Sequence, residues 1–329
     1  MAAWPAAKRA DIIRYSKWRE DLPWNSCTDE KMFTDDVVGM RVPPISSDAS
    51  LSKNGHVATK LELPVTLPTD VDMVSLLREA IRENKNDIRS HLDLDGKPFV
   101  IYNCARRSNY PSPGYNKPVT RAHVDLLKFP LPDFIAKYGI RNSAGQLDTE
   151  ESKTFFSEGI GPKTQYTLLN LWVCVECNPK NTLAVLHTPE SGFGDNLTSR
   201  TLHPGTRGQT STTAVKHRPE DMWAYLPAAD RPPVDPPAAT KLCDAVAFYT
   251  ARTPHQAIES GKSRRISVEF RILVKGHGAV GTFECQQQSF KERGSQKRGR
   301  SAHDPKDQER GSPKRGRSAH DPKDHSGAD

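Results

Sequence analysis

The sequence predicts a mainly β protein, a barrel or double-sheet jelly roll with helices packed outside it. Short segments with strand character recur along the chain, stretches rich in Pro and Gly separate them, and few segments show a helical period. The clearest separators are residues 204–208 and 231–238. Many short strands joined by turns, with few helices among them, are typical of these two architectures.

The predicted elements follow in chain order. A short helix is expected from Asp11 to Arg19. A longer amphipathic helix is expected from Asp70 to Arg89, because apolar residues recur there at helical spacing and Thr69 is a suitable N-terminal cap. Asp95-Gly96 marks a turn. Strands are predicted over residues 98–104, 119–124, 165–175, 182–186, 222–226, 245–250 and 265–274.

Three segments are expected: a helical or irregular N-terminal segment (1–60), the β domain (61–285) and a disordered basic tail (286–329). The tail contains a 17-residue direct repeat, in which Glu292 to Gln308 recurs as Glu309 to His325 with two positions changed. The repeat has no large apolar residue and cannot bury enough surface to offset the entropy of ordering. A solvated tail without a site is the favoured interpretation, and a nuclear import signal or an RNA-contacting arm is the alternative.

The charge and the apolar pattern argue against several classes of protein. The formal net charge is +7, of which residues 292–329 supply +3, with ten Lys/Arg against seven Asp/Glu. The mild excess elsewhere is not the footprint of a nucleic-acid-binding surface, so we do not expect a nucleic-acid partner. No apolar run of about 18 residues and no signal-peptide stretch is present, so we expect a soluble cytoplasmic protein without a membrane partner.

Six cysteines are few for a chain of this length and argue against a secreted disulfide scaffold. Cys174 and Cys177 have CxxC spacing, but on a regular strand their side chains would face opposite sides. Neither Cys243 nor Cys285 belongs to a second pair that would complete a zinc site. We therefore expect ordinary reduced thiols.

His123-Val124-Asp125 is an HxD triplet at the end of a predicted strand. Residues i and i+2 of a strand project to the same face, so the imidazole and the carboxylate can bind one ion together. Nitrogen and oxygen ligands with open positions are typical of non-haem Fe(II) oxygenases, which need one further His. A second HxD, His91-Leu92-Asp93, falls at the end of the predicted helix, where positions i and i+2 diverge by about 200°. We expect His91 to lie at the surface and to help end the helix.

The strongest signal lies near the end of the β domain. His255 follows a predicted strand, and ten residues later another strand begins in which polar residues alternate strictly with apolar ones. The polar positions are Arg265, Ser267, Glu269 and Arg271. Such a strand either faces solvent or lines a polar ligand site, and the preceding His255 favours a ligand site.

In this combination the chain resembles the Fe(II)/2-oxoglutarate-dependent dioxygenases with a double-stranded β-helix (jelly-roll, cupin-like) core. More narrowly, it is similar to the fungal hydroxylase/desaturase family that includes gibberellin-desaturase-like and cephamycin-type enzymes. The resemblance covers about residues 60–275. This chain departs from the family after Trp172, where Val173-Cys174 replaces the usual Arg-Pro, and the family has no counterpart of the tail repeat. The matching motifs are residues 92–96, 122–125 and 169–172, Pro254-His255, and Arg265-x-Ser267-x-Glu269-x-Arg271.

The resemblance implies a metal site and a co-substrate. His123, Asp125 and His255 would bind Fe(II) as a facial triad. Arg265 would pair with the distal carboxylate of 2-oxoglutarate, and Ser267 would add a hydrogen bond to the same group.

Three further residues take weaker roles from the resemblance. Arg271 would reach the other end of the co-substrate or a carboxylate of the substrate. Asn170 and Trp172 would line the pocket. The segments 126–165 and 187–220 would form lid insertions over the mouth of the barrel, where substrate choice is made.

The implied reaction uses O2 and 2-oxoglutarate to form a ferryl species that abstracts hydrogen from a C–H bond. Hydroxylation, desaturation or ring closure of a small molecule would follow, the substrate being an amino acid or a specialised-metabolite intermediate. Asp125 argues against a halogenase, which needs a small residue at that position.

Two other functions stay open on the sequence alone. One is an oxygenase that acts on a macromolecule held by the basic tail, and the other is a non-catalytic jelly-roll binding module with a coincidental triad. The remaining histidines of the middle region (His187, His203 and His217) are expected to be surface or satisfied polar residues. Among them, His187 is the best substitute for His255 as a ligand.

Overall fold

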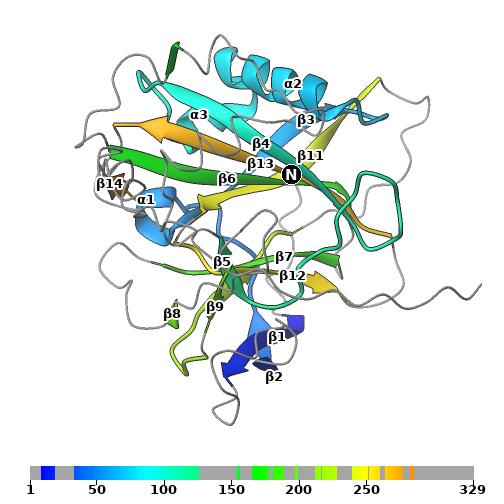
Figure 1. Cartoon of the computed structure of the whole chain (residues 1–329), viewed down its shortest axis with the longest axis vertical. Helices are drawn as coiled ribbons and strands as arrows, with labels where there is room; N and C mark the ends of the chain where they lie inside the picture. Colours follow the sequence, from blue (N-terminus) through cyan, green and yellow to red (C-terminus); the bar gives the residue numbers. More distant parts are fainter. Residues whose placement is uncertain are drawn as a thin grey trace, which may run out of the picture. The chain divides into compact units, whose positions relative to one another are not determined.

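A computed structural model describes residues 9–18, 33–125, 154–155, 165–177, 181–188, 197–198, 212–215, 217–227, 239–250, 252–259, 264–276 and 282–284. The basic tail and most of the two expected lid insertions lie outside these residues. The described residues form antiparallel sheets with few helices (Figure 1).

Two sheets form the body of the fold. The large sheet has the order β3-β11-β6-β13-β4, and β14 pairs with β6 at one end. Its strands are β3 (His56–Pro64), β4 (Phe99–Ser108), β6 (Gln165–Glu176), β11 (Thr240–Tyr249), β13 (Ile266–Lys275) and β14 (Thr282–Glu284). The small sheet has the order β10-β7-β12-β5-β9-β8. Its strands are β5 (His123–Asp125), β7 (Asn181–Leu186), β8 (Leu197–Thr198), β9 (Thr212–Val215), β10 (Trp223–Tyr225) and β12 (His255–Glu259).

The connections make this arrangement a jelly roll. The chain passes from β4 in the large sheet to β5 in the small one, back to β6 and again to β7, and it repeats the exchange through β11, β12 and β13. Strands that are distant in sequence therefore become neighbours, so that β13 pairs with both β4 and β6, and β12 pairs with both β5 and β7. The predicted fold class, mainly β with a double-stranded β-helix core and flanking helices, is confirmed.

The helices α2 and α3 cover the outer face of the large sheet (Figure 1). The main one, α2 (Asp70–Arg82), begins with Thr69, whose side chain accepts a hydrogen bond from the backbone N–H of Asp72. The helix predicted to reach Arg89 ends earlier, because Asn84 adopts a left-handed conformation with φ of 52°. A 3-10 turn, η1 (Lys85–Asp87), and the short helix α3 (Ile88–His91) replace its last turns, and α1 (Leu51–Asn54) precedes β3.

The two faces of the large sheet have different neighbours. On β13, Val268, Phe270 and Ile272 belong to the hydrophobic cluster under α2, together with residues of α2 and α3. The opposite face meets the small sheet, where Trp172 and Phe248 of the large sheet pack with Val185 of β7. Residues 266–274 are all buried, so β13 is a central strand covered on both faces and not the solvent-facing strand that its alternation also allowed.

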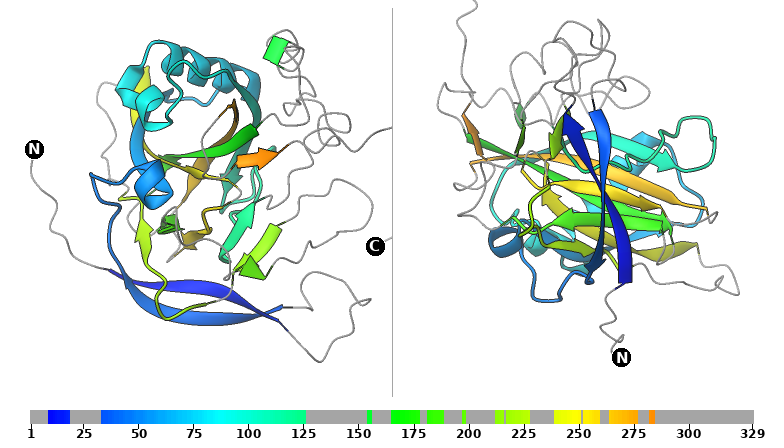
Figure 2. Two further views of the ribbon diagram at one scale, coloured as in Figure 1. Left: turned by 90° about the vertical axis from the view of Figure 1, so that its left-hand side faces the viewer. Right: turned by 90° about the horizontal axis from the view of Figure 1, so that it is seen from below.

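The N-terminal region differs from the expectation. The segment Asp11 to Arg19 was predicted to be helical, but β1 (Arg9–Trp18) is a strand that pairs antiparallel with β2 (Phe33–Val42). This pair lies along the outer side of the small sheet (Figure 2). Ile13 and Tyr15 are both fully buried there, with the half-buried Arg14 between them. That two-residue period is typical of a strand, and a run this short is ambiguous on its own.

The remaining strands occupy the predicted segments with small shifts. The strand expected over residues 119–124 is reduced to His123–Asp125, so the HxD triplet is itself the strand. Six strands of the described residues have no counterpart among the predicted elements: β2, β3, β8, β9, β12 and β14. Within the described part of the chain, no helix is both long and apolar enough to cross a membrane.

A bulge changes the position of the two neighbouring cysteines. Ile266 pairs with Glu176 and the next residue, Ser267, pairs with Cys174, so Val175 is an extra residue on β6. The bulge reverses the alternation, and the free thiols of Cys174 and Cys177 meet in a hydrogen bond. The expectation that they face opposite sides is therefore wrong. Burial, aided by this hydrogen bond, raises the pKa of Cys174 well above its usual value.

Candidate metal centre

Three potential metal ligands meet on the inner side of the small sheet. His123 and Asp125 come from β5, and His255 begins β12, where it lies directly opposite His123 in the antiparallel pair. One ligand atom from each residue lies within 4.8 Å of the other two, and all three residues are buried. Within the described residues, this is the one cluster of His, Cys, Asp or Glu with such a geometry.

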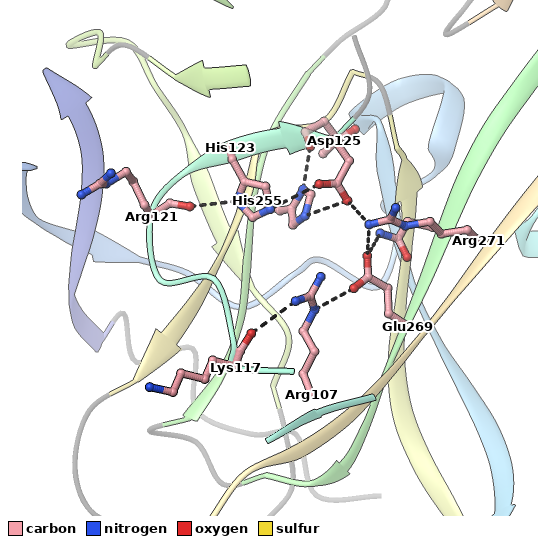
Figure 3. Close-up of polar contacts among 10 residues, drawn as sticks. Arg107, Lys117, Arg121, His123, Asp125, His255, Glu269 and Arg271 are labelled. Atoms are coloured by element: carbon pink, nitrogen blue, oxygen red, sulfur yellow. Dashed lines mark hydrogen bonds and ion pairs between the residues drawn. The ribbon is translucent and has the colours of Figure 1, made fainter. Parts of the chain in front are cut away.

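Both imidazoles are oriented by backbone carbonyls. His123 Nδ1 lies 2.8 Å from the carbonyl oxygen of Arg121, and His255 Nδ1 lies 3.1 Å from that of Thr253 (Figure 3). A carbonyl can only accept a hydrogen bond, so each Nδ1 carries a proton, and the neutral form of each ring then has its lone pair on Nε2. The two Nε2 atoms face Asp125, with His123 Nε2 3.5 Å from Oδ1 and His255 Nε2 3.9 Å from Oδ2.

The protonation states suit a cation. Burial, with a contribution from His255, lowers the pKa of His123 to about 4, so its ring is neutral at pH 7. Burial acts to raise the pKa of Asp125, but Arg271, His123 and His255 outweigh it and hold that pKa below its ordinary value. Two imidazoles and one carboxylate are the ligand set of non-haem Fe(II) sites, with positions left over for other ligands. The residues present therefore fit Fe(II).

A chain of buried charges continues from Asp125 into the large sheet. Arg271 Nη2 donates to Asp125 Oδ2 at 2.8 Å and to Glu269 Oε1 at 3.2 Å. Glu269 also accepts from Arg107 Nε at 2.9 Å and from Asn170 Nδ2 at 2.7 Å (Figure 3). Burial acts to raise the pKa of Glu269, but Arg107 and Arg271 hold it well below its usual range, so the carboxylate is ionised.

A small cavity of about 20 Å³, partly open to solvent, lies beside His123 and His255. His123 and His255 line it on the small sheet, and Arg265 lines it on the other side. The Arg265 guanidinium lies 5.2 Å from the ring centre of Trp172, and the side chain is 1% exposed. The apolar wall of the cavity consists of Val119, Leu183, Phe248 and Ala257. The cavity thus joins a candidate metal centre to a buried cation.

The other residues singled out in the sequence lie at defined places around this cavity. Asn170 and Trp172 line it. Ser267 is fully buried, and its hydroxyl has no hydrogen-bond partner among the described residues, but it does not line the cavity. Arg271 contacts Asp125 and Glu269, and it is not among the lining residues.

Sequence reasoning missed two members of the site. Glu269 was noted only as a polar position of its strand, and Arg107 was not noted at all. Both line the cavity and pair with each other. The available signal was the alternation of Glu269 with apolar neighbours. Its partner could not be identified because β4 and β13 are far apart in the sequence, although Ser267 lies opposite Arg107 in their register.

The rival HxD triplet has no such surroundings. His91 ends α3, and its Nδ1 lies 2.9 Å from the hydroxyl of Thr59. Asp93 adopts a left-handed conformation and forms an ion pair with Lys97 at 2.6 Å. Among the described histidines of the middle region, His187 contacts Asn54 and His217 stacks near Tyr15. His203 lies outside the described residues.

Comparison with solved structures gives neighbours that include an iron-dependent enzyme. An iron and alpha-ketoglutarate-dependent endoperoxidase, NvfI, in a different conformation, aligns with a TM-score of 0.49 and 13% identity, covering 82% of this chain and 98% of that one. A second structure of the same enzyme has a TM-score of 0.47 and 12% identity over the same shares. No protein-family model matches the sequence, and no curated protein matches it.

Proposed function

We propose that this protein is a non-haem Fe(II)- and 2-oxoglutarate-dependent oxygenase that acts on a small molecule. The observation that carries the proposal is the buried cluster of His123, Asp125 and His255, which opens into the same cavity as the buried Arg265. A metal ligand set and a cation for a carboxylate are the two features that this co-substrate requires. We propose the cytoplasm as its location.

His123, Asp125 and His255 would hold the metal, through the two Nε2 atoms and a carboxylate oxygen. When bound, Fe(II) supplies the activation of O2 for attack on a C–H bond. The backbone carbonyls of Arg121 and Thr253 keep the imidazole rings in the ligating tautomer.

Arg265 would bind the distal carboxylate of 2-oxoglutarate. Its guanidinium is fixed by the large sheet and by the face of Trp172, so little side-chain entropy is lost when an anion binds. Burial strengthens the pairing, because an ion pair away from water is less screened. Ser267 stands two residues further on the same strand, and its buried hydroxyl is available for a hydrogen bond within the loaded site.

Apolar residues around the cavity would exclude water from the reacting C–H bond. Phe248 contributes directly, since its ring lies 4.6 Å from that of His255. Hydroxylation, desaturation and ring closure need the same ligands, and the substrate would be an amino acid or a specialised-metabolite intermediate. We also propose that the protein belongs to the narrower hydroxylase/desaturase family, because it carries the motif that runs from Arg265 to Arg271.

The test is an anaerobic titration of metal-free protein with Fe(II) and 2-oxoglutarate, followed through the weak visible charge-transfer band of the chelate. We expect the band in the native protein and in His91→Ala, and its loss in His255→Ala. His91→Ala is the matched control because it removes the histidine of the other HxD triplet.

Each other result selects an alternative. Fe(II) binding without the band would exclude 2-oxoglutarate as the co-substrate, and with it the proposed role of Arg265. Absence of metal binding would exclude the oxygenase function and favour a non-catalytic jelly-roll binding module.

A further inference from the structure

The buried charges behind the metal cluster need a reason other than stability. Asp125, Arg271 and Glu269 are each at most 9% exposed, and Arg107 extends the chain to the cavity. Removing charges from water costs several kcal/mol per ion, and a buried ion pair is often no more stabilising than apolar residues of the same volume. A network of this kind beside a candidate metal ligand therefore points to a role at the metal.

The contacts define what that role is. Both oxygens of Asp125 face the histidines, with Oδ1 3.5 Å from His123 Nε2 and Oδ2 3.9 Å from His255 Nε2. Arg271 Nη2 engages only Oδ2, at 2.8 Å, so Oδ1 is the oxygen without a contact to Arg271. A carboxylate with one oxygen engaged by a guanidinium presents the other oxygen to a cation. Arg271 itself is anchored by Glu269, which Asn170 and Arg107 hold in turn.

We infer that Arg271 is a positioning residue: anchored by Glu269, it fixes the carboxylate of Asp125 so that Asp125 binds the metal through one oxygen. This inference rests on the proposed metal site and assigns Arg271 a place other than the co-substrate. Asp125 then occupies a single coordination position, which leaves more positions for ligands that enter from the cavity.

Pairs of substitutions test this without changing the charge of the site. Glu269→Gln with Arg271→Gln removes one anion and one cation, and it releases Asp125. Glu269→Gln with Arg107→Gln also removes one of each, but it retains the contact between Arg271 and Asp125. Since both variants have the native net charge, a difference between them reports the contact with Asp125.

We measure Co(II) binding to the metal-free proteins by calorimetry and record the visible spectrum of the bound Co(II), which depends on the coordination number. Loss of an outer contact to a metal ligand typically weakens metal binding by roughly 10- to 100-fold. We expect a loss of that size and an altered spectrum for the Arg271 pair. The Arg107 pair weakens the anchor but keeps the contact between Arg271 and Asp125, so its affinity and spectrum should lie between those of the native protein and those of the Arg271 pair. Equal affinities and equal spectra in the two variants would overturn the inference.

Arg271→Lys provides a second measurement if the Arg271 pair does not fold, which circular dichroism shows. The ammonium is a point charge on a flexible stem and lacks the rigid fork of Arg. We expect weaker Co(II) binding and an altered spectrum, and native values for both would overturn the inference. If the native protein binds no metal, the proposed function fails as well. If it binds metal and gives the co-substrate band while the variants match it, only this inference fails.

Discussion

Each of the three candidate metal ligands has a contact within the protein that sets its orientation. The two imidazoles donate from Nδ1 to carbonyls of their own strand ends, and Asp125 accepts from Arg271. Because these contacts come from the protein itself, the three ligand atoms converge before any cation arrives. Pre-orientation of this kind lowers the cost of binding a metal.

At the residue scale, Arg265 gives the most direct prediction. Arg265→Gln should weaken 2-oxoglutarate binding by roughly 10- to 100-fold, since a hydrogen bond to a charged group contributes about 1.5–3 kcal/mol. Fe(II) binding should stay at its native strength, because Arg265 is not a ligand. Titration of the anaerobic Fe(II) protein with 2-oxoglutarate measures both quantities.

The matched control for Arg265 is Arg106→Gln. Arg106 pairs with Asp70 at 2.6 Å, at the start of α2 on the helix-covered side of the large sheet. This variant should bind 2-oxoglutarate as the native protein does. A similar weakening in both variants would mean that the loss comes from the sheet as a whole.

The residue-scale features differ in how far the sequence could predict them. His123, Asp125 and His255 were identified because their types and spacing match a strand and a known pattern, and the structure brings them together. Arg271 was assigned to the co-substrate because it shares a strand face with Arg265, yet it contacts Asp125. Alternation gives the face of a strand, but it does not give the side chain that lies opposite.

At the element scale, Gly55 joins the parts that support His255. It ends α1 with φ of 75°, and its carbonyl accepts a hydrogen bond from the hydroxyl of Thr253 at 2.8 Å. The carbonyl of Thr253 in turn holds the imidazole of His255. A Cβ at position 55 would lie 2.1 Å from Oγ1 of Thr188, so this close approach requires glycine.

Gly55→Ala should therefore destabilise the protein by about 2–4 kcal/mol, from left-handed strain together with the clash. Gly96→Ala is the control, because Gly96 also has a positive φ of 67° but nothing lies within 4 Å of its added Cβ. The control should lose only about 1–2 kcal/mol. Urea unfolding of the metal-free proteins measures both, and equal losses would contradict the role of the close approach.

The elements that sequence reasoning misjudged share a physical cause. β1 was taken for a helix because a short run with few apolar residues carries little periodic signal, and its partner β2 supplies the hydrogen bonds that decide the matter. The long helix was extended too far because its apolar pattern continues to Ile88, which is buried, while the break at Asn84 depends on one backbone conformation.

At the scale of the whole molecule, the jelly roll was predictable from the number of short strands and the scarcity of helices. The pairing of the strands was not, since the register between segments distant in the sequence depends on which faces meet across the two sheets. The alternation on β13 placed the site on the correct face of the large sheet. The segments that were expected to form the lid insertions, 126–165 and 187–220, carry no readable pattern in the sequence.

His56 predicts how global stability depends on pH. Burial, with a contribution from His187, lowers the pKa of His56 to about 4, and its Nδ1 has no hydrogen-bond partner in the part of the chain that the structure describes. The unfolded chain takes up this proton near pH 6.5, while the folded protein does not. Stability from this residue is therefore complete above pH 6.5 and is lost as the pH falls toward 4.

The loss between pH 7 and pH 5 should be about 2 kcal/mol for His56 alone. His56→Gln removes the titration, so the variant should lose about that much less stability than the native protein over the same range. Urea unfolding of the metal-free proteins at the two pH values measures the difference. Equal losses in both proteins would mean that His56 does not titrate on unfolding.

The two histidines of the metal cluster lie opposite each other in one antiparallel pair, although most of the β domain separates them in the sequence. Closing so long a loop is slow, because the chain entropy must be lost before the contact forms. During refolding, the complete ligand set therefore exists only after β12 has docked beside β5, late in the assembly of the sheets. A divalent cation can then stabilise the folded state by binding to it, but it cannot initiate folding.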